Sequence, residues 1–138
     1  MIETGNWTLP VNNGGDIAYK PPLFHWCIAA LSSIAGKVTE YTSRMPSALA
    51  LIAMVLGGFL FYAKRRGASV ALLMGLITLS NFEVYRAGMN CRVDMMLTAF
   101  IVLALYQLYR WCEKGQKGFP WIATLFMGCA TPVSYTHL

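Results

Sequence analysis

Long apolar stretches separated by short polar segments dominate this chain. The longest, residues 45–63, reads MPSALALIAMVLGGFLFYA and holds no charged side chain. Residues 67–82 (GASVALLMGLITLSNF) and 95–109 (MMLTAFIVLALYQLY) are also uncharged, and residues 119–130 (FPWIATLFMGCA) begin a fourth stretch. A helix needs roughly 20 mainly apolar residues to cross about 30 Å of hydrocarbon. The pattern therefore predicts transmembrane helices at about 45–63, 67–82, 95–109 and 119–130.

A shorter apolar stretch, residues 23–35, follows Lys20 and two prolines. Its sequence, LFHWCIAALSSIA, has 13 residues, which are too few to cross a bilayer but suit a helix lying in the interface. The prolines fit the first turn of such a helix, where backbone N–H groups have no intrahelical partner. We expect an interfacial helix at about 22–35, inside a loop formed by residues 1–44.

Charged residues fall between the apolar stretches and make the two ends of the predicted bundle different. Residues 64–66 and 110–117 hold six Lys or Arg and one acid, whereas residues 1–44 and 83–94 hold five of each. The formal net charge of +5 therefore resides in two short loops, which the positive-inside tendency assigns to the cytoplasm. The basic balance indicates topology, and no nucleic-acid partner is expected.

Composition agrees with a membrane protein. Hydrophobic residues make up 57% of the chain and charged residues only 12%, unlike a soluble domain. The four cysteines form no CxxC pair, so they predict neither a zinc site nor a disulfide framework. We interpret them as small apolar side chains of the helices.

Lys20 stands at the N-terminal end of the expected interfacial helix. Unpaired backbone N–H groups and the helix dipole favour an anion there, so an added ammonium group predicts a seat for a lipid phosphate. The alternative interpretation is that Lys20 only snorkels or meets anionic lipid, as membrane-flanking lysines commonly do. The spacing alone leaves both interpretations open.

Asp94 stands at the start of the third predicted span, and Arg92 lies two residues before it. An ionisable residue at the end of an apolar bundle, on the same side as a phosphate seat, is what a membrane active site needs. Alternatively, Asp94 only compensates the dipole of its helix and Arg92 neutralises it. Both interpretations stay open at this point.

Three segments together resemble a known family: ETGNWTLPVNNGGDIAYKPPLFHWCIAAL, EYTSRMPSALALIAMV and YRAGMNCRVDMMLTAFIVLALYQLYR. In order and spacing they are similar to the early part of the polyprenyl-phosphate-sugar glycosyltransferases, over about residues 2–125. That group includes the protein O-mannosyltransferases and the bacterial lipid A aminoarabinose transferases. The resemblance implies an all-α integral membrane protein of the GT-C type, a multi-helix bundle with interfacial helices in its first outer loop.

The activity that this resemblance implies is transfer of a sugar from a polyprenyl-phosphate carrier to an acceptor. The acceptor is lipid A, a protein or another glycan, and the active site faces the outside or periplasm of a bacterial inner membrane. The expected partners are the lipid-linked sugar, the lipid or protein acceptor, and membrane lipids.

Four residues match the motifs of the family. Lys20 and the two prolines after it match a lysine–proline motif whose lysine holds the carrier phosphate. Arg44 matches an arginine-x-proline-small pattern at the start of the next span, and Arg92 and Asp94 match an arginine–proline–aspartate motif, with valine in place of its proline. The resemblance thus implies substrate-binding roles for Lys20, Arg44 and Arg92, and a supporting catalytic role for Asp94.

Other positions depart from the family pattern. The main catalytic acid belongs to an aspartate–glutamate pair that this sequence lacks, and it is expected upstream of Met1. Tyr19 stands where the aminoarabinose enzymes carry a glutamate associated with metal; no metal ligand is assigned, and a divalent metal is the one cofactor left open. Residues 131–138 (TPVSYTHL) do not resemble the family, so we expect a non-native tail on an N-terminal fragment.

Two other functional classes are compatible with the same residues. A lipid-phosphate-binding or transport protein would use the outer cations without needing a catalytic acid. A structural membrane subunit would use its charges only to set topology. The glycosyltransferase interpretation depends chiefly on the resemblance.

Overall fold

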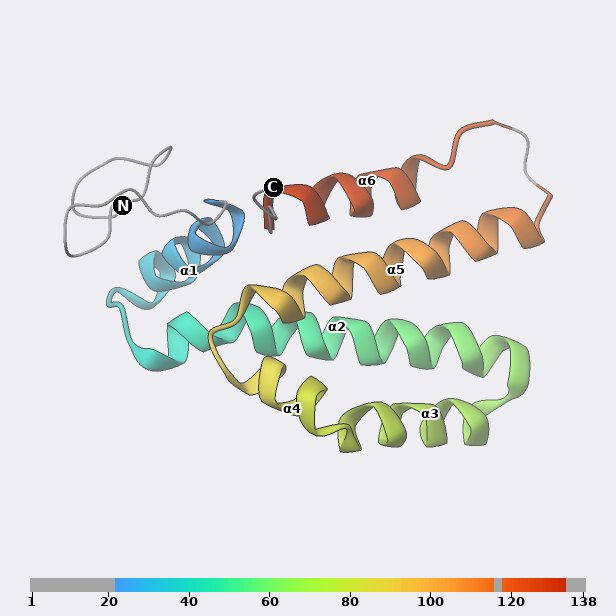
Figure 1. Cartoon of the computed structure of the whole chain (residues 1–138), viewed down its shortest axis with the longest axis horizontal. Helices are drawn as coiled ribbons and strands as arrows, with labels where there is room; N and C mark the ends of the chain where they lie inside the picture. Colours follow the sequence, from blue (N-terminus) through green and yellow to red (C-terminus); the bar gives the residue numbers. More distant parts are fainter. Residues whose placement is uncertain (1–21, 116–117, 134–138) are drawn as a thin grey trace.

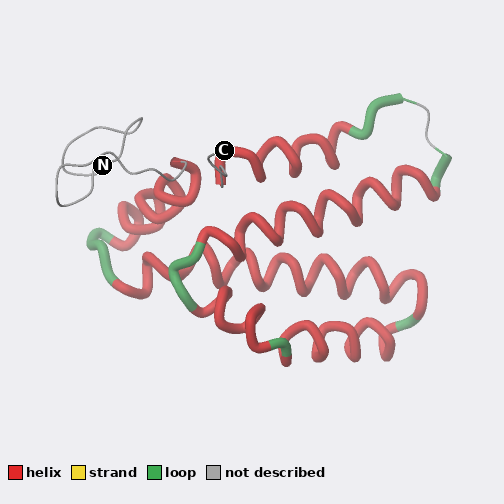
Figure 2. Tube along the Cα trace, in the orientation of Figure 1, coloured by secondary structure: helices red, strands yellow, loops and turns green. Residues whose placement is uncertain are grey.

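The computed structural model describes residues 22–115 and 118–133, and every regular element in that part of the chain is helical (Figure 1). The elements are, in order, α1 (Pro22–Ala35), α2 (Glu40–Arg66), α3 (Ala68–Ser80), α4 (Phe82–Met89), α5 (Val93–Glu113), α6 (Trp121–Ala130) and the 3-10 turn η1 (Thr131–Val133). Short loops join them (Figure 2). The prediction of an all-α membrane fold is confirmed.

Helices α2 and α5 are each long and apolar enough to cross a membrane. They contain the predicted stretches 45–63 and 95–109 and extend past both ends of each. Helices α3 and α4 pass the same test as a pair but bend by 73° where they meet, as a broken span or a re-entrant loop does. Helix α1 and the segment formed by α6 and η1 are apolar but shorter.

Asn81 causes the bend between α3 and α4. Its side-chain oxygen accepts hydrogen bonds from the backbone N–H groups of Glu83 (3.1 Å) and Val84 (3.3 Å). Asparagine is a favoured N-cap, so it starts a new helix within a continuous apolar run. The sequence pattern predicts one span over 67–82 and a connection over 83–94, whereas the structure places eight of these residues in the capped helix α4.

Helices α3, α2, α5 and α6 lie side by side in that order (Figure 1). The central helix, α2, contacts α1, α3, α4 and α5. The connections after Arg66 and Glu113 lie at one end of the bundle, and α1, α4 and the first turns of α2 and α5 lie at the other (Figure 1). The basic loops are therefore separated from Arg44, Arg92 and Asp94 by the length of the long helices.

Two apolar clusters hold this arrangement together. One joins α2 to α5 through Leu51, Met54, Met95 and Ala99. The other joins α1, α5 and η1 through Phe24, Met96 and Val133. Val133 is fully buried, although it belongs to the segment that the sequence analysis sets apart from the family.

Close packing of α4 on α2 requires a glycine. A Cβ atom added at Gly88 would lie 2.4 Å from Cδ2 and 3.1 Å from Cβ of Leu51, so it would clash with the Leu51 side chain. Small residues at helix contacts allow such a close approach within a membrane. Gly88 therefore sets the distance between α4 and α2.

Replacing Gly88 with Ala is expected to lower the thermal unfolding temperature of the full-length protein in detergent. Overpacking costs about 1–3 kcal/mol, more than the roughly 1 kcal/mol by which alanine improves a helix. Gly128→Ala in α6 is the matched control, since an added Cβ there meets nothing within 4 Å, and its unfolding temperature should stay level or rise. Equal shifts in both variants would contradict the proposed role of Gly88.

Candidate functional site

A buried serine links two of the motifs that the sequence analysis singles out. Ser47, near the start of α2, is fully buried, and its hydroxyl donates to the carbonyl of Arg92 at 2.9 Å. The same oxygen accepts from the Arg92 N–H at 3.2 Å, and this N–H also bonds the carbonyl of Asn90 at 2.9 Å. The backbone just before α5 is therefore fixed against α2, although the two residues are 45 positions apart.

A chain of hydroxyl groups joins α1 to the first turn of α2. Thr39 and Thr42 form a capping box in which each side chain accepts from the other residue's backbone N–H. The buried Ser32 of α1 donates to the Thr42 hydroxyl at 3.1 Å. Helix α1 is thus positioned relative to α2, and Lys20, which precedes α1 by two residues, lies outside the described residues.

Arg44 lies one turn after the first residue of α2 and forms an ion pair with Glu40. The two side chains are 47% and 73% exposed, respectively. A pair this exposed contributes little to stability because water competes for both charges. The guanidinium group of Arg44 is therefore free to exchange its carboxylate partner for another anion.

Arg92 and Asp94 face one another at the start of α5. The distance from Nε of Arg92 to Oδ2 of Asp94 is 3.7 Å, and their side chains are 45% and 61% exposed. Asp94 also lies in the first turn of α5, where an acid compensates the helix dipole. The structure thus contains the neutralising pair considered as one alternative, and it leaves both groups accessible to a ligand.

The structure brings three of the four predicted site residues to one end of the bundle. Arg44 comes from α2, and Arg92 and Asp94 come from the start of α5, with Ser47 joining the two elements. Chemically, two guanidinium groups can bind a phosphate, and a carboxylate can accept a hydrogen bond from a hydroxyl. No local sequence pattern indicates the role of Ser47, because the partner of its hydroxyl is distant in sequence.

The described part of the chain contains no candidate metal site. Within residues 22–115 and 118–133, no group of three or more His, Cys, Asp or Glu residues is placed to hold a metal ion. Tyr19 lies outside these ranges. On α1, burial raises the pKa of the Cys27 thiol above its ordinary value, which weakens the thiol as a ligand or nucleophile.

Comparison with known proteins gives one family and two relatives. The family model described as "Dolichyl-phosphate-mannose-protein mannosyltransferase" matches residues 19–138. A protein of Shewanella sediminis (strain HAW-EB3), named undecaprenyl phosphate-alpha-4-amino-4-deoxy-L-arabinose arabinosyl transferase, is 28% identical over 137 residues, covering 94% of this chain and 24% of the relative. An uncharacterized protein of Aquifex aeolicus (strain VF5) is 27% identical over 128 residues, covering 91% of this chain and 25% of the relative.

The chain thus spans about a quarter of the length of these two relatives. No solved structure matches it. The family match contains Lys20, Arg44, Arg92 and Asp94. It also runs through residues 131–138, the segment that the sequence analysis expects to be non-native.

Replacing Ser47 with Ala is expected to lower the unfolding temperature of the full-length protein. The change leaves the carbonyl of Arg92 without its side-chain donor, at a cost of about 1–3 kcal/mol for a buried polar group. Ser80→Ala is the control, since that exposed hydroxyl only bonds a carbonyl of its own helix, that of Ile77. If thermal unfolding in detergent shifts no more for Ser47→Ala than for Ser80→Ala, the Ser47 link is not needed for stability.

Proposed function

The chain belongs to the dolichyl-phosphate-mannose-protein mannosyltransferase family, and from this premise we propose that the whole protein transfers a sugar from a polyprenyl-phosphate carrier to an acceptor. The match over residues 19–138 is the observation that carries the proposal. The printed name of the Shewanella relative, a transferase acting on an undecaprenyl-phosphate-linked sugar, supports a lipid-phosphate donor. The acceptor is lipid A, a protein or another glycan.

The proposed chemistry is displacement at the anomeric carbon of the sugar. An acceptor hydroxyl attacks that carbon while a carboxylate takes its proton, and the bond to the carrier's phosphate oxygen breaks. The electron pair leaves with the phosphate, so negative charge grows on the leaving group in the transition state. Fixed cations close to that phosphate therefore lower the barrier.

Lys20, Arg44 and Arg92 are proposed as the cations that hold the carrier phosphate. The accessible ion pairs of Arg44 and Arg92 support this role, because each can exchange a carboxylate for a phosphate. Asp94 is proposed to orient Arg92 and the acceptor hydroxyl. The proton-accepting carboxylate is assigned to an aspartate–glutamate pair of the kind that the family resemblance implies, and to no residue named in this site.

The proposed orientation places this site at the periplasmic face of a bacterial inner membrane. Basic residues gather where α2 and α5 end, at the opposite end of the bundle from the starts of these helices (Figure 1). They are Lys64, Arg65, Arg66, Arg110 and Lys114. Cytoplasmic loops carry an excess of Lys and Arg, which favours the cytoplasm for the basic end.

Replacing Lys20 with Ala in the full-length protein is expected to reduce sugar transfer by about 100-fold or more, the typical loss when one charge-stabilising group is removed. Arg92→Gln should also reduce transfer. The measurement is release of labelled sugar from polyprenyl-phosphate donors in membranes, with membrane insertion checked by immunoblot. The control is Lys37→Ala, which removes the same charge from an exposed position between α1 and α2.

Undiminished transfer in Lys20→Ala would remove that residue from the site. Transfer lost equally in Lys37→Ala would make the effect one of general charge. If the unaltered full-length protein binds the carrier but releases sugar to no acceptor, the non-catalytic lipid-phosphate-binding alternative replaces the enzyme proposal.

Two exposed cysteines at opposite ends of α5 test the orientation. Cys91 lies in the turn before α5 and Cys112 in its last turn. In full-length variants that keep one of these two cysteines and no other, a membrane-impermeant maleimide added to spheroplasts should label Cys91, and should label Cys112 only after permeabilisation. The opposite labelling pattern would place the candidate site in the cytoplasm.

A further inference from the structure

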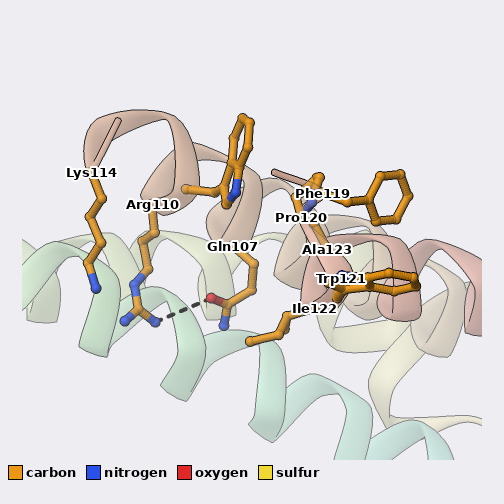
Figure 3. Close-up of a pocket in the computed structure, with 9 residues that line it drawn as sticks. Gln107, Arg110, Lys114, Phe119, Pro120, Trp121, Ile122 and Ala123 are labelled. Carbon is orange, nitrogen blue, oxygen red and sulfur yellow. Dashed lines mark hydrogen bonds between the residues drawn. The ribbon is translucent and has the colours of Figure 1, made fainter. Parts of the chain in front are cut away.

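A cavity of about 600 Å³ lies at the basic end of the bundle, away from Arg44, Arg92 and Asp94. The end of α5 lines one side through Gln107, Arg110, Trp111 and Lys114, and residues 119–123 line the other as α6 begins. Figure 3 shows Gln107 and Arg110 on α5, Lys114 just after its end, and Pro120, Trp121, Ile122 and Ala123 across from them. The proposed transfer reaction uses none of these residues.

The cavity carries positive charge that no described carboxylate balances. Arg110 lies in the last turn of α5 and Lys114 caps the end of that helix, and their side chains extend in the same direction (Figure 3). Arg110 donates to the side-chain oxygen of Gln107 at 3.3 Å. The nearby acid, Glu113, pairs instead with Arg65 of α2. An anion is therefore the ligand that complements this lining.

Exposed aromatic and aliphatic side chains border the same cavity. The rings of Phe119 and Trp121 meet edge to face with centroids 4.9 Å apart, and they are 56% and 75% exposed. Aromatic side chains of this kind gather at the headgroup level of membranes. Beyond them, Ile122 and Leu125 of α6 are more than half exposed and provide an apolar surface for acyl chains.

We propose that this cavity binds the headgroup phosphate of an anionic phospholipid in the leaflet at the basic end of the bundle. Arg110 and Lys114 meet the phosphate, the aromatic rings lie at headgroup depth, and the acyl chains run along α6. A basic pocket between membrane helices on the cytoplasmic side is a known setting for such lipids. The first turn of α6 also favours an anion, because no described side chain caps its backbone N–H groups.

If these basic residues served only to orient the protein in the membrane, the variants would give a different result. Basic residues at the C-terminal end of a helix compensate its dipole and set orientation, and that role needs no cavity. Arg66 ends α2 at the same end of the bundle and does not line this cavity. A lipid site thus predicts that Lys114 and Arg66 differ, whereas a topological role predicts that they act alike.

The test uses the full-length protein purified in mild detergent and incubated with equal amounts of phosphatidylglycerol and phosphatidylethanolamine. Native mass spectrometry then counts the lipids that stay bound. We expect preferential retention of phosphatidylglycerol, weakened about fivefold in affinity by Lys114→Gln and by Arg110→Gln but hardly by Arg66→Gln. Thermal unfolding of each variant, measured without added lipid, checks that all three are folded.

Three outcomes would overturn the proposal. Equal losses in Arg66→Gln and Lys114→Gln would reduce it to general charge attraction. Unchanged retention in both cavity variants would mean that other parts of the full-length protein cover the cavity. Displacement of phosphatidylglycerol by inorganic phosphate or glycerol phosphate at equal concentration would identify a site for soluble phosphate, not for lipid. Lipid retention requires no sugar transfer, so this inference and the proposed function can fail separately.

Discussion

The hydrogen bonds between the Ser47 hydroxyl and the backbone of Arg92 are the constraint on which the candidate site depends. They fix the turn before α5 against α2, so that Arg44 and the Arg92–Asp94 pair lie at one end of the bundle. Helix α4 leads into that turn and must pass close to α2, which is possible because Gly88 leaves room for Leu51. Within a membrane protein, buried backbone groups need such internal partners, since water is not there to replace them.

The sequence predicts the features that depend on local composition and misses those that depend on distant partners. The apolar runs of α2 and α5 indicate two spans because a helix satisfies its own backbone in lipid. The break at Asn81 escapes this reasoning, since one polar residue barely changes the hydropathy of the run and yet caps a new helix. Helix α2 begins at the Thr39 capping box, before its apolar run, because hydrogen bonding and not hydropathy sets that boundary. The partner of Ser47 could not be predicted, because nothing near it in sequence indicates Arg92.

The two ends of the α2–α5 pair differ in how firmly their arginines are held. Arg65 is 20% exposed, pairs with Glu113 and lies 4.0 Å above the ring of Phe61, so ring and carboxylate together restrict it. Arg44 and Arg92 are 47% and 45% exposed, and the carboxylates that pair with them in the described part of the chain are exposed too. A residue that fastens two helices benefits from several buried contacts. The proposed binding and release of a substrate phosphate would benefit from weak contacts, because each turnover must break them.

The distribution of carboxylates extends this contrast to the whole bundle. At the candidate site, Arg44 and Arg92 each pair with an exposed acid, so a phosphate bound there as proposed would compete with carboxylates and could leave again. At the opposite end, Arg110 and Lys114 border a cavity in which no described carboxylate competes. An anion bound there does not compete with a described carboxylate for Arg110 and Lys114. This favours a ligand that stays bound over a substrate that must leave. The proposed turnover at one end and the proposed lipid retention at the other thus differ in whether carboxylates lie beside the basic side chains.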